Sequence, residues 1–296
     1  MPEKDSMTGT SEEKNSAGIR LFAGGAAAPS LDEMKRIALR LRRNIVTMIG
    51  KAGSGHPGGS LSAVEILTAL YFKVLRQGAA YTCDPARDRF ILSKGHAAPA
   101  LYATLAEAGY IPVAELFTLR KLGSRLQGHT DCSIPGIEMS SGALGQGLSF
   151  GIGVALAGRI DGLGYKVYVL LGDGECDEGQ VWEAAMAAAH FKLDNLIAIV
   201  DRNQIQLDGW TKDIMNLEPM ADKWRSFGWH VLEVDGHDLA RVINALEQAK
   251  EVKGQPAVII AHTVKGKGVS FMENNPDFHG KAPTAEQLEI ALKELQ

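Results

Sequence analysis

Short runs of Val, Ile and Leu recur through the second half of the chain, and each run is bounded by turn residues. They lie at 166–171, 196–201, 230–235 and 257–262. Helical stretches occur between some of them, at 181–191 and 239–252. Runs of this length and composition predict strands, and strands that alternate with helices predict a parallel sheet. We therefore expect an α/β fold with a mainly parallel, twisted sheet and helices on both of its faces.

The first half of the chain is predicted to be mainly helical. Ser30 followed by Glu33 is a capping-box pattern that opens a helix reaching about residue 49. The other expected elements are a loop at 50–59, a strand at 89–93, and helices at 61–74, 98–108, 113–119, 144–157 and 285–295. We expect residues 30–296 to form one domain. Residues 1–29, which begin with a mixture of Glu, Lys, Ser and Thr, are expected to form a flexible tail.

Composition and charge do not indicate several classes of partner and site. The 296 residues carry a formal net charge of -4, which gives no reason to expect a nucleic acid or an anionic membrane as a partner. No apolar run approaches the roughly 18 residues that a membrane span needs. The three cysteines form no CxxC pair, so neither a zinc site nor a disulfide framework is indicated. A reducing cytoplasm is the expected location.

Polar residues follow two consecutive predicted strands. A Gly-Asp-Gly sequence centred on Asp173 comes directly after the run at 166–171, and Asn203 comes just after the run at 196–201. In parallel sheets, ligands bind beyond the carboxyl ends of the strands. Glycines let the backbone approach a phosphate closely, and Asp and Asn oxygens suit Mg²⁺ or Ca²⁺ rather than zinc. A Gly-Asp-Gly alone is more often a plain turn, but the Asn after the next strand favours a site.

Half of the eight histidines sit beside glycines in predicted loops: His56, His96, His129 and His279. Imidazole is the side chain suited to moving protons near neutral pH, so this grouping predicts a catalytic role. Any one of these residues alone would more often belong to a surface turn. The other histidines occupy helical or strand contexts and are interpreted as structural: His190, His230, His237 and His262.

Several motifs occur in the order in which they occur in the first half of transketolases. They are GHPGG, LSKGHAAPALYATL, SSGALGQGLSFGIGVALA, GDGECDEGQVWEA and VDRNQIQLDGW, followed by TVKGKG and FHGKAP. Over about residues 30–296 the chain therefore resembles the thiamine-diphosphate-dependent transketolase family, as an N-terminal subunit of a split enzyme. The resemblance implies the thiamine diphosphate-binding fold and, within it, the domain that binds the diphosphate and the metal.

The resemblance also implies a metal site and a cofactor site. Mg²⁺ (or Ca²⁺) would be held by Asp173, Asn203 and the backbone carbonyl of Ile205. The cofactor would contact His96, Gly142, Ala143, Leu144, Gly174 and His279. The chain departs from the family at Ala143, where the usual sequence is Gly-Pro-Leu, and this puts the local backbone shape in doubt.

The loop histidines acquire separate roles from the resemblance. His56 and His129 would line the substrate channel and contact sugar hydroxyls. His96 and His279 would reach the diphosphate side of the cofactor and the reacting carbon, so the catalytic set is His56, His129 and His279. Thr130 follows His129 where the family usually has proline, which again puts the local backbone in doubt. Glu178 resembles a structural acid near the subunit interface.

A second polypeptide is expected from the same resemblance. In this family a glutamate from a second α/β domain touches the aminopyrimidine of the cofactor and activates its thiazolium ring. The chain ends at Gln296, where that domain would begin. We therefore expect a separate subunit that carries the pyrimidine-binding domain, in an α2β2 assembly, and no ketol transfer by this chain alone.

The expected reaction is transfer of a two-carbon ketol unit from a ketose phosphate to an aldose phosphate, with the substrate phosphate bound largely by the partner. A split enzyme for a branched or sulfonated sugar is an alternative. The α subunit of a 2-oxo acid dehydrogenase is another, although the GHPGG and SKGH loops argue against it. Deoxyxylulose-phosphate synthase shares the TVKGKG pattern, but it is normally one long chain and differs near the Asn. A non-catalytic subunit is disfavoured because Asp173, Asn203 and the loop histidines are intact.

Overall fold

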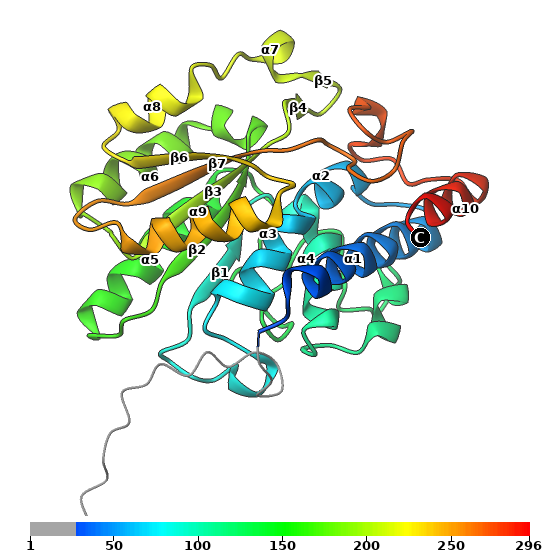
Figure 1. Ribbon diagram of the computed structural model, residues 1–296, viewed down its shortest axis with the longest axis horizontal. Helices are drawn as coiled ribbons and strands as arrows, with labels where there is room; N and C mark the ends of the chain where they lie inside the picture. The colour runs from blue at the N-terminus through cyan, green and yellow to red at the C-terminus, as the bar shows by residue number, and fades with distance from the viewer. Residues whose placement is uncertain (1–27) are drawn as a thin grey trace, which may run out of the picture.

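A five-stranded parallel sheet forms the centre of the computed structural model, which describes residues 28–296 (Figure 1). The expected tail at 1–29 lies almost entirely outside the described residues. In spatial order the strands are β1 (Arg89–Leu92), β2 (Val167–Gly172), β3 (Leu196–Arg202), β7 (Ala257–His262) and β6 (His230–Asp235). All the pairings in this sheet are parallel, so the carboxyl ends of the strands gather at one edge. The expected sheet is confirmed.

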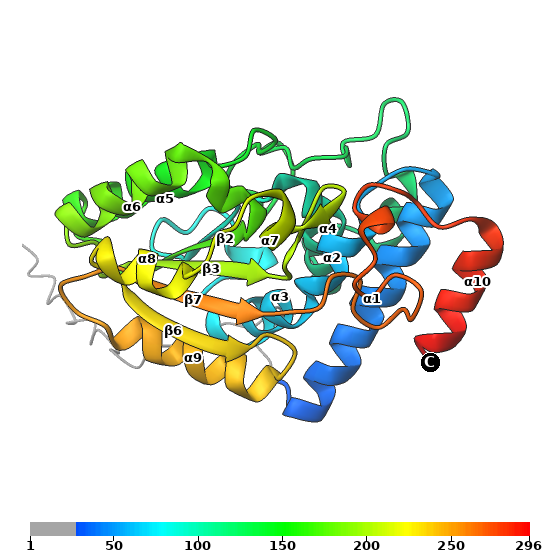
Figure 2. The same ribbon diagram turned by 90° about the horizontal axis from the view of Figure 1, so that it is seen from above.

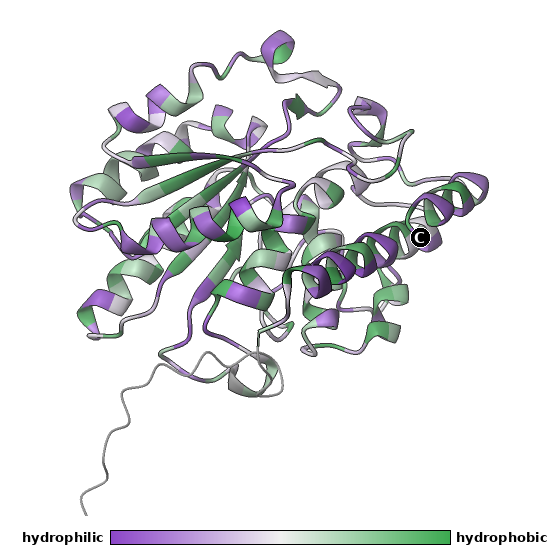
Figure 3. Ribbon diagram, in the orientation of Figure 1, coloured by the Kyte–Doolittle hydropathy of each residue, from purple (hydrophilic) through white to green (hydrophobic). Residues whose placement is uncertain are grey.

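The apolar runs reflect strands that are covered on both faces. Every residue of β2 is buried, and so is almost all of β3 and β7, whereas the edge strand β6 is largely half-exposed. Figure 3 shows the same contrast, with strongly hydrophobic strands inside and mixed helices around them. A strand buried on both faces reads as an unbroken hydrophobic run, which is why these elements could be found from the sequence.

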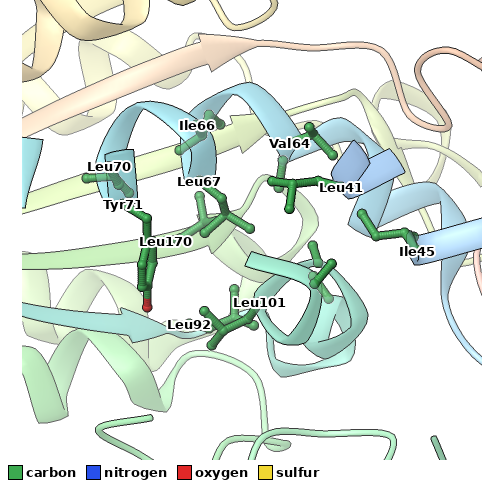
Figure 4. Packing of buried hydrophobic residues seen from close by; sticks show 14 of the residues in the cluster. Leu41, Ile45, Val64, Ile66, Leu67, Leu70, Tyr71, Leu92, Leu101 and Leu170 are labelled. Atoms are coloured by element: carbon green, nitrogen blue, oxygen red, sulfur yellow. The ribbon is translucent and has the colours of Figure 1, made fainter. Parts of the chain in front are cut away.

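Helices cover the two faces of the sheet as separate layers (Figure 2). One layer packs on alternate strand residues such as Tyr168 and Leu170, and its principal helices are α1 (Leu31–Ala52), α3 (Val64–Ala69), α4 (Ala98–Glu107) and α9 (Leu239–Glu251). Figure 4 shows the apolar side chains of this layer around Leu170. The other layer packs on Val167, Val169 and Leu171, and comprises α5 (Gln146–Ile160), α6 (Gly179–His190) and α8 (Met220–Ser226).

The structure divides the first half of the chain differently from the sequence-based prediction. Helix α1 continues to Ala52. The next residue, Gly53, ends it with a left-handed φ of 64°, and its N–H bonds to the Gly50 carbonyl. Helix α2 (Pro57–Ser62) then begins inside the predicted loop, because proline suits the first turn of a helix. The expected helix at 61–74 is therefore α2, α3 and a π-helical turn at Leu70–Val74, and the expected helix at 113–119 is a 3-10 segment, Val113–Thr118.

Several short elements were not predicted. A hairpin of β4 (Ile205–Gln206) and β5 (Gly209–Trp210) follows β3 and leads into α7 (Thr211–Ile214). Such short strands leave no detectable alternation in the sequence. The 3-10 turns at Ala79–Tyr81, Gly95–Ala97, Gly174–Asp177 and Pro276–Phe278 are equally short, whereas the last helix, α10 (Ala285–Glu294), was expected. None of the helices in residues 28–296 is long and apolar enough to cross a membrane.

The packing of α5 on β2 gives a stability test within one helix. A Cβ atom on Gly151 would lie 2.7 Å from Cγ2 of Val169, whereas a Cβ on Gly153 would meet nothing within 4 Å. Gly151→Ala should lower the free energy of unfolding by about 1–2 kcal/mol through overpacking. Gly153→Ala should raise it by about 0.5–1 kcal/mol through helix propensity. Urea unfolding midpoints measure both, and equal upward shifts would contradict close packing of α5 on β2.

Candidate functional site

A cavity of about 310 Å³ lies at the carboxyl ends of β2 and β3. Most of the residues singled out from the sequence line it: His96, His129, Gly142, Leu144, Asp173, Gly174, Asn203, Ile205 and His279. Ala143 is exposed and does not line the cavity. His56 is not among the lining residues either, but its ring lies close to the other imidazoles. A larger hollow of about 590 Å³ between α1 and α9 contains none of these residues.

The oxygen donors predicted to hold a metal lie together in this cavity. Asp173 is 3% exposed, and its carboxylate accepts hydrogen bonds from the backbone N–H groups of Gly174 and Gln204. Gln204 has a left-handed φ of 64°, which is uncommon for a residue with a side chain. The Asn203 Oδ1 atom accepts a bond of 3.2 Å from the Ile205 N–H. The turn after β3 is thereby fastened to the end of β2.

This donor set fits a hard divalent cation. Burial, and then the nearby Asp201, raises the pKa of Asp173 to about 6, so a bound cation would stabilise its charged form. A carboxylate, an amide oxygen and a carbonyl suit Mg²⁺ or Ca²⁺. Among the described residues, no group of three or more His, Cys, Asp or Glu side chains could hold a metal ion, which leaves this mixed set as the candidate.

The cavity also offers features that suit a phosphate. The Gln206 Nε2 atom is buried beside the cavity and has no hydrogen-bond partner among residues 28–296. A Cβ atom on Gly174 would lie 2.6 Å from the Gln206 Cβ, so only glycine leaves the turn open there. An unpartnered buried amide is a ready donor to an oxyanion. The residues present therefore fit a metal-bound diphosphate.

The loop histidines converge from four distant segments into one cluster. The ring centroid of His56 lies 5.4 Å from that of His96, 6.2 Å from that of His129 and 5.5 Å from that of His279. The His96 and His279 rings are 5.3 Å apart. The sequence-based grouping of these residues thus corresponds to a spatial cluster at the cavity.

All the clustered imidazoles are neutral at pH 7. Burial, aided by nearby cations, lowers the pKa of His56 to about 4 and that of His279 to about 3. The pKa of His96 falls well below its usual value, mainly through burial and then through Lys94, and burial and Arg120 lower that of His129. Neutral imidazoles can both accept and donate a proton.

A buried ion pair, one member of which lines the cavity, was missed in the sequence. Lys94 and Asp201 are 1% and 0% exposed, and their charged atoms are 2.5 Å apart. The Asp201 carboxylate also accepts bonds from Ser62 Oγ, Thr263 Oγ1 and, at 3.4 Å, Asn203 Nδ2. Although burial opposes it, the Lys94 ammonium holds the pKa of Asp201 below its ordinary value. The bond from Asn203 Nδ2 to Asp201 orients the Asn203 amide.

Glu175 is a second buried acid that the sequence did not reveal. Its carboxylate accepts bonds from Ser93 Oγ, from the Gly145 N–H at 2.9 Å and from the Gly172 N–H at 3.0 Å. Ser93 Oγ in turn accepts a bond of 3.1 Å from the Gly147 N–H. Glu175 therefore joins the loops that carry His96, Leu144 and Asp173 into one wall of the cavity.

Two cations near the histidines were also missed. Lys265, in the TVKGKG segment, is 2% exposed and lies at the cavity, and Arg120 donates to Ser54 Oγ beside His129. The acids and lysines lay within recognised motifs, but charged residues are usually exposed, so the sequence carried no signal of their burial.

The departure from the family pattern at Thr130 has a local consequence. Thr130 Oγ1 bonds to Ser141 Oγ and, at 3.2 Å, to the Met139 carbonyl, so it fastens the His129 loop to the loop before Gly142.

The histidines interpreted as structural do not line the cavity. Among them, His237 lies between the Glu65 carboxylate and the Val264 N–H. Glu178 is exposed at the rim of the cavity, just before α6.

Comparison with known proteins agrees with this geometry. Residues 34–295 match the model of a family described as "Transketolase, thiamine diphosphate binding domain". One subunit of the apulose-4-phosphate transketolase of Phocaeicola vulgatus is 47% identical over 86% of this chain and 90% of its own length. The 6-deoxy-6-sulfo-D-fructose transketolase subunit SqwG of a Clostridium species is 48% identical over 86% of this chain and 94% of its own.

Single-chain transketolases match over a smaller share of their length. Human transketolase is 41% identical over 90% of this chain but only 42% of its own. The solved transketolase of Campylobacter jejuni is 33% identical, with a TM-score of 0.85 over 90% of this chain and 43% of that one. The chain thus spans about two fifths of these proteins. It belongs to the family of the thiamine diphosphate binding domain of transketolases.

Proposed function

We propose that this chain is the diphosphate-binding subunit of a split transketolase, which transfers a two-carbon ketol unit from a ketose phosphate to an aldose phosphate. The observation that carries the proposal is one cavity that joins an oxygen donor set at the ends of β2 and β3 to a cluster of neutral imidazoles. The similarity to proteins named as transketolase subunits supports the same conclusion.

The residues divide into holding and reacting groups. Asp173, Asn203 and the Ile205 carbonyl would hold Mg²⁺ (or Ca²⁺), and Gly174 would leave room for the diphosphate beside them. Bound thiamine diphosphate would supply the electron sink for cleavage of the carbon–carbon bond. His96 and Leu144, which line the same cavity, would orient the cofactor.

The imidazoles would move protons and recognise hydroxyls. His56 and His129 are assigned to the sugar hydroxyls, and His279 to proton transfer at the reacting carbon. Since burial keeps each ring neutral at pH 7, each has one N–H that can donate and one nitrogen that can accept, and its surroundings decide which of the two faces the ligand. Holding these groups in place before the substrate arrives reduces the entropy that the reaction must lose.

A second polypeptide is part of the proposal. The names of the relatives support it, because an enzyme whose chains are named as subunits comprises more than one chain. We assign the pyrimidine-binding domain to that second chain, α2β2 to the assembly, a place near the subunit interface to Glu178, and the cytoplasm to the enzyme.

The sugar is a separate question. The relatives are named for apulose 4-phosphate and 6-deoxy-6-sulfo-D-fructose, and both are more similar to this chain than human transketolase is. This favours, as a second candidate, a split transketolase for a branched or sulfonated sugar. The relatives named above are transketolases, so the 2-oxo acid dehydrogenase alternative is not proposed.

Ketol transfer should require the partner. The purified chain with Mg²⁺ and thiamine diphosphate should show negligible transfer, because the pyrimidine-binding part is assigned to another subunit. Addition of the pyrimidine-domain subunit should restore the activity, measured as product formed from a ketose phosphate and an aldose phosphate. Full activity of the chain alone would refute the split assignment.

Asp173→Ala should weaken cofactor binding in the assembled complex by about 100-fold, because it removes the charged donor of the oxygen set. Calorimetric titration of thiamine diphosphate in the presence of Mg²⁺ measures the dissociation constant. Asp208→Ala is the matched control, since Asp208 is exposed on the neighbouring hairpin and lies outside the cavity lining. Equal affinity in the two variants would show that the metal site is wrongly assigned.

Acid should destabilise the chain partly through His56. In the folded state the pKa of His56 is about 4, against 6.5 for an unperturbed histidine, so protons bind the unfolded chain more readily. Stability is therefore lost as pH falls below 6.5 towards 4. Between pH 7.5 and 5.0, the wild type should lose about 1 kcal/mol more than His56→Gln, after allowance for solvent screening. Urea unfolding at both pH values tests this, and parallel losses would contradict it.

A further inference from the structure

Lys265 places its ammonium between the oxygen donor set and the histidine cluster. Its Nζ atom donates a hydrogen bond of 2.8 Å to the Ile205 carbonyl and also lies 2.8 Å from Nδ1 of His279, within hydrogen-bond distance. The side chain is 2% exposed, so water does not compete for these bonds. One residue thus touches both halves of the site.

The backbone around Lys265 fixes where its side chain begins. The Gly266 N–H bonds to the Gly58 carbonyl at 3.0 Å, and the Lys265 carbonyl accepts from the Asn274 N–H at 2.9 Å. A Cβ atom on Gly58 would lie 3.0 Å from Cγ of Lys265, so the glycine permits close packing of the stem. Contacts with two other segments of the chain, at Gly58 and Asn274, thus direct the Lys265 side chain into the site.

The contact with His279 determines which ring nitrogen carries the proton. An ammonium group has three donors and no acceptor, so Nδ1 of His279 must accept. A neutral imidazole has a single N–H, and that hydrogen must then lie on Nε2. The pKa of His279 is lowered to about 3 by burial and by Lys265, so the ring is neutral at pH 7.

The other imidazoles of the cluster have no comparable partner. Nδ1 of His56 is buried and lacks a hydrogen-bond partner in the part of the chain that the structure describes. Across residues 28–296, no side-chain hydrogen bond is found for His96 or His129 either. Within the described cluster, a defined tautomer is therefore imposed on His279 alone.

We propose that Lys265 is a positioning residue that holds His279 as the Nε2–H tautomer, so that His279 offers a hydrogen-bond and proton donor to the ligand in the cavity. The tautomer is a property of this chain, and its catalytic meaning rests on the proposed function.

Nitrogen NMR of the full chain, labelled with ¹⁵N-histidine, tests the tautomer directly. His279→Gln identifies the His279 signals. In the wild type, Nδ1 should show the shift of an unprotonated acceptor and Nε2 that of a protonated nitrogen. A protonated Nδ1 in the wild type would by itself overturn the proposal, and no variant of Lys265 would be needed.

Variants then test whether Lys265 is the cause. Lys265→Met should move both His279 shifts towards the average of the two tautomers, and Lys265→Arg, which keeps a donor, should restore the wild-type pattern. Lys267→Met is the matched control, because Lys267 lies in the same segment but pairs with Glu273. Unchanged His279 shifts in a folded Lys265→Met chain would overturn the proposal.

Kinetics of the assembled complex test the catalytic meaning. At saturating thiamine diphosphate and Mg²⁺, Lys265→Met should lower kcat about 10-fold or more, and Lys265→Arg should recover most of it. A kcat equal to that of Lys267→Met would overturn the positioning role. Absence of ketol transfer by the wild-type complex would instead refute the proposed function, while the NMR result would still decide the tautomer.

Discussion

The geometry of the site depends on the buried ion pair between Lys94 and Asp201. Asp201 ends the apolar part of β3, and its carboxylate also receives Ser62 from α2 and Thr263 from the segment after β7. Removing both charges from water costs several kcal/mol for each ion, and this cost is offset only when the pair is fully hydrogen-bonded. Lys94 meets that condition with a further bond to the Gly59 carbonyl at 3.0 Å. Loss of either partner would leave an uncompensated charge, and loss of Asp201 would also remove the bond of 3.4 Å from Asn203 Nδ2.

Charge within the cavity is arranged to receive a polyanion together with a cation. Lys94 is neutralised by Asp201, whereas Lys265 forms no ion pair with any of the described residues and bonds to a carbonyl and an imidazole instead. Burial, followed by Lys94, lowers the pKa of Lys265 to about 8, which still leaves it charged at pH 7. Once a divalent cation is bound at Asp173, that cation and Lys265 would supply positive charge beside a diphosphate. The neutral imidazoles stand beside these charges as groups that can exchange protons.

Sequence patterns could locate the sheet and the residues at its edge, because both follow from simple constraints. Strands β2, β3 and β7 are buried on both faces, so their apolar runs are unbroken, and Asp173 and Asn203 directly follow β2 and β3. The roles of Glu175 and Lys265 could not be found in this way. Their burial arises from contacts with loops far away in the sequence, such as those through Ser93 and Ile205. The division of the helix predicted at 61–74 and the two-residue strands of the hairpin also depend on tertiary packing rather than on local periodicity.

The central claim is that this chain anchors a metal-bound diphosphate at the ends of β2 and β3. A crystal structure of the chain with its partner subunit, thiamine diphosphate and Mn²⁺ in place of Mg²⁺ tests it most directly, because Mn²⁺ can be located by its anomalous scattering. We expect one strong anomalous peak for each copy of this chain, within coordination distance of the Asp173 carboxylate, the Asn203 amide oxygen and the Ile205 carbonyl, with the diphosphate beside it. A peak elsewhere, or a diphosphate bound outside this cavity, would contradict it.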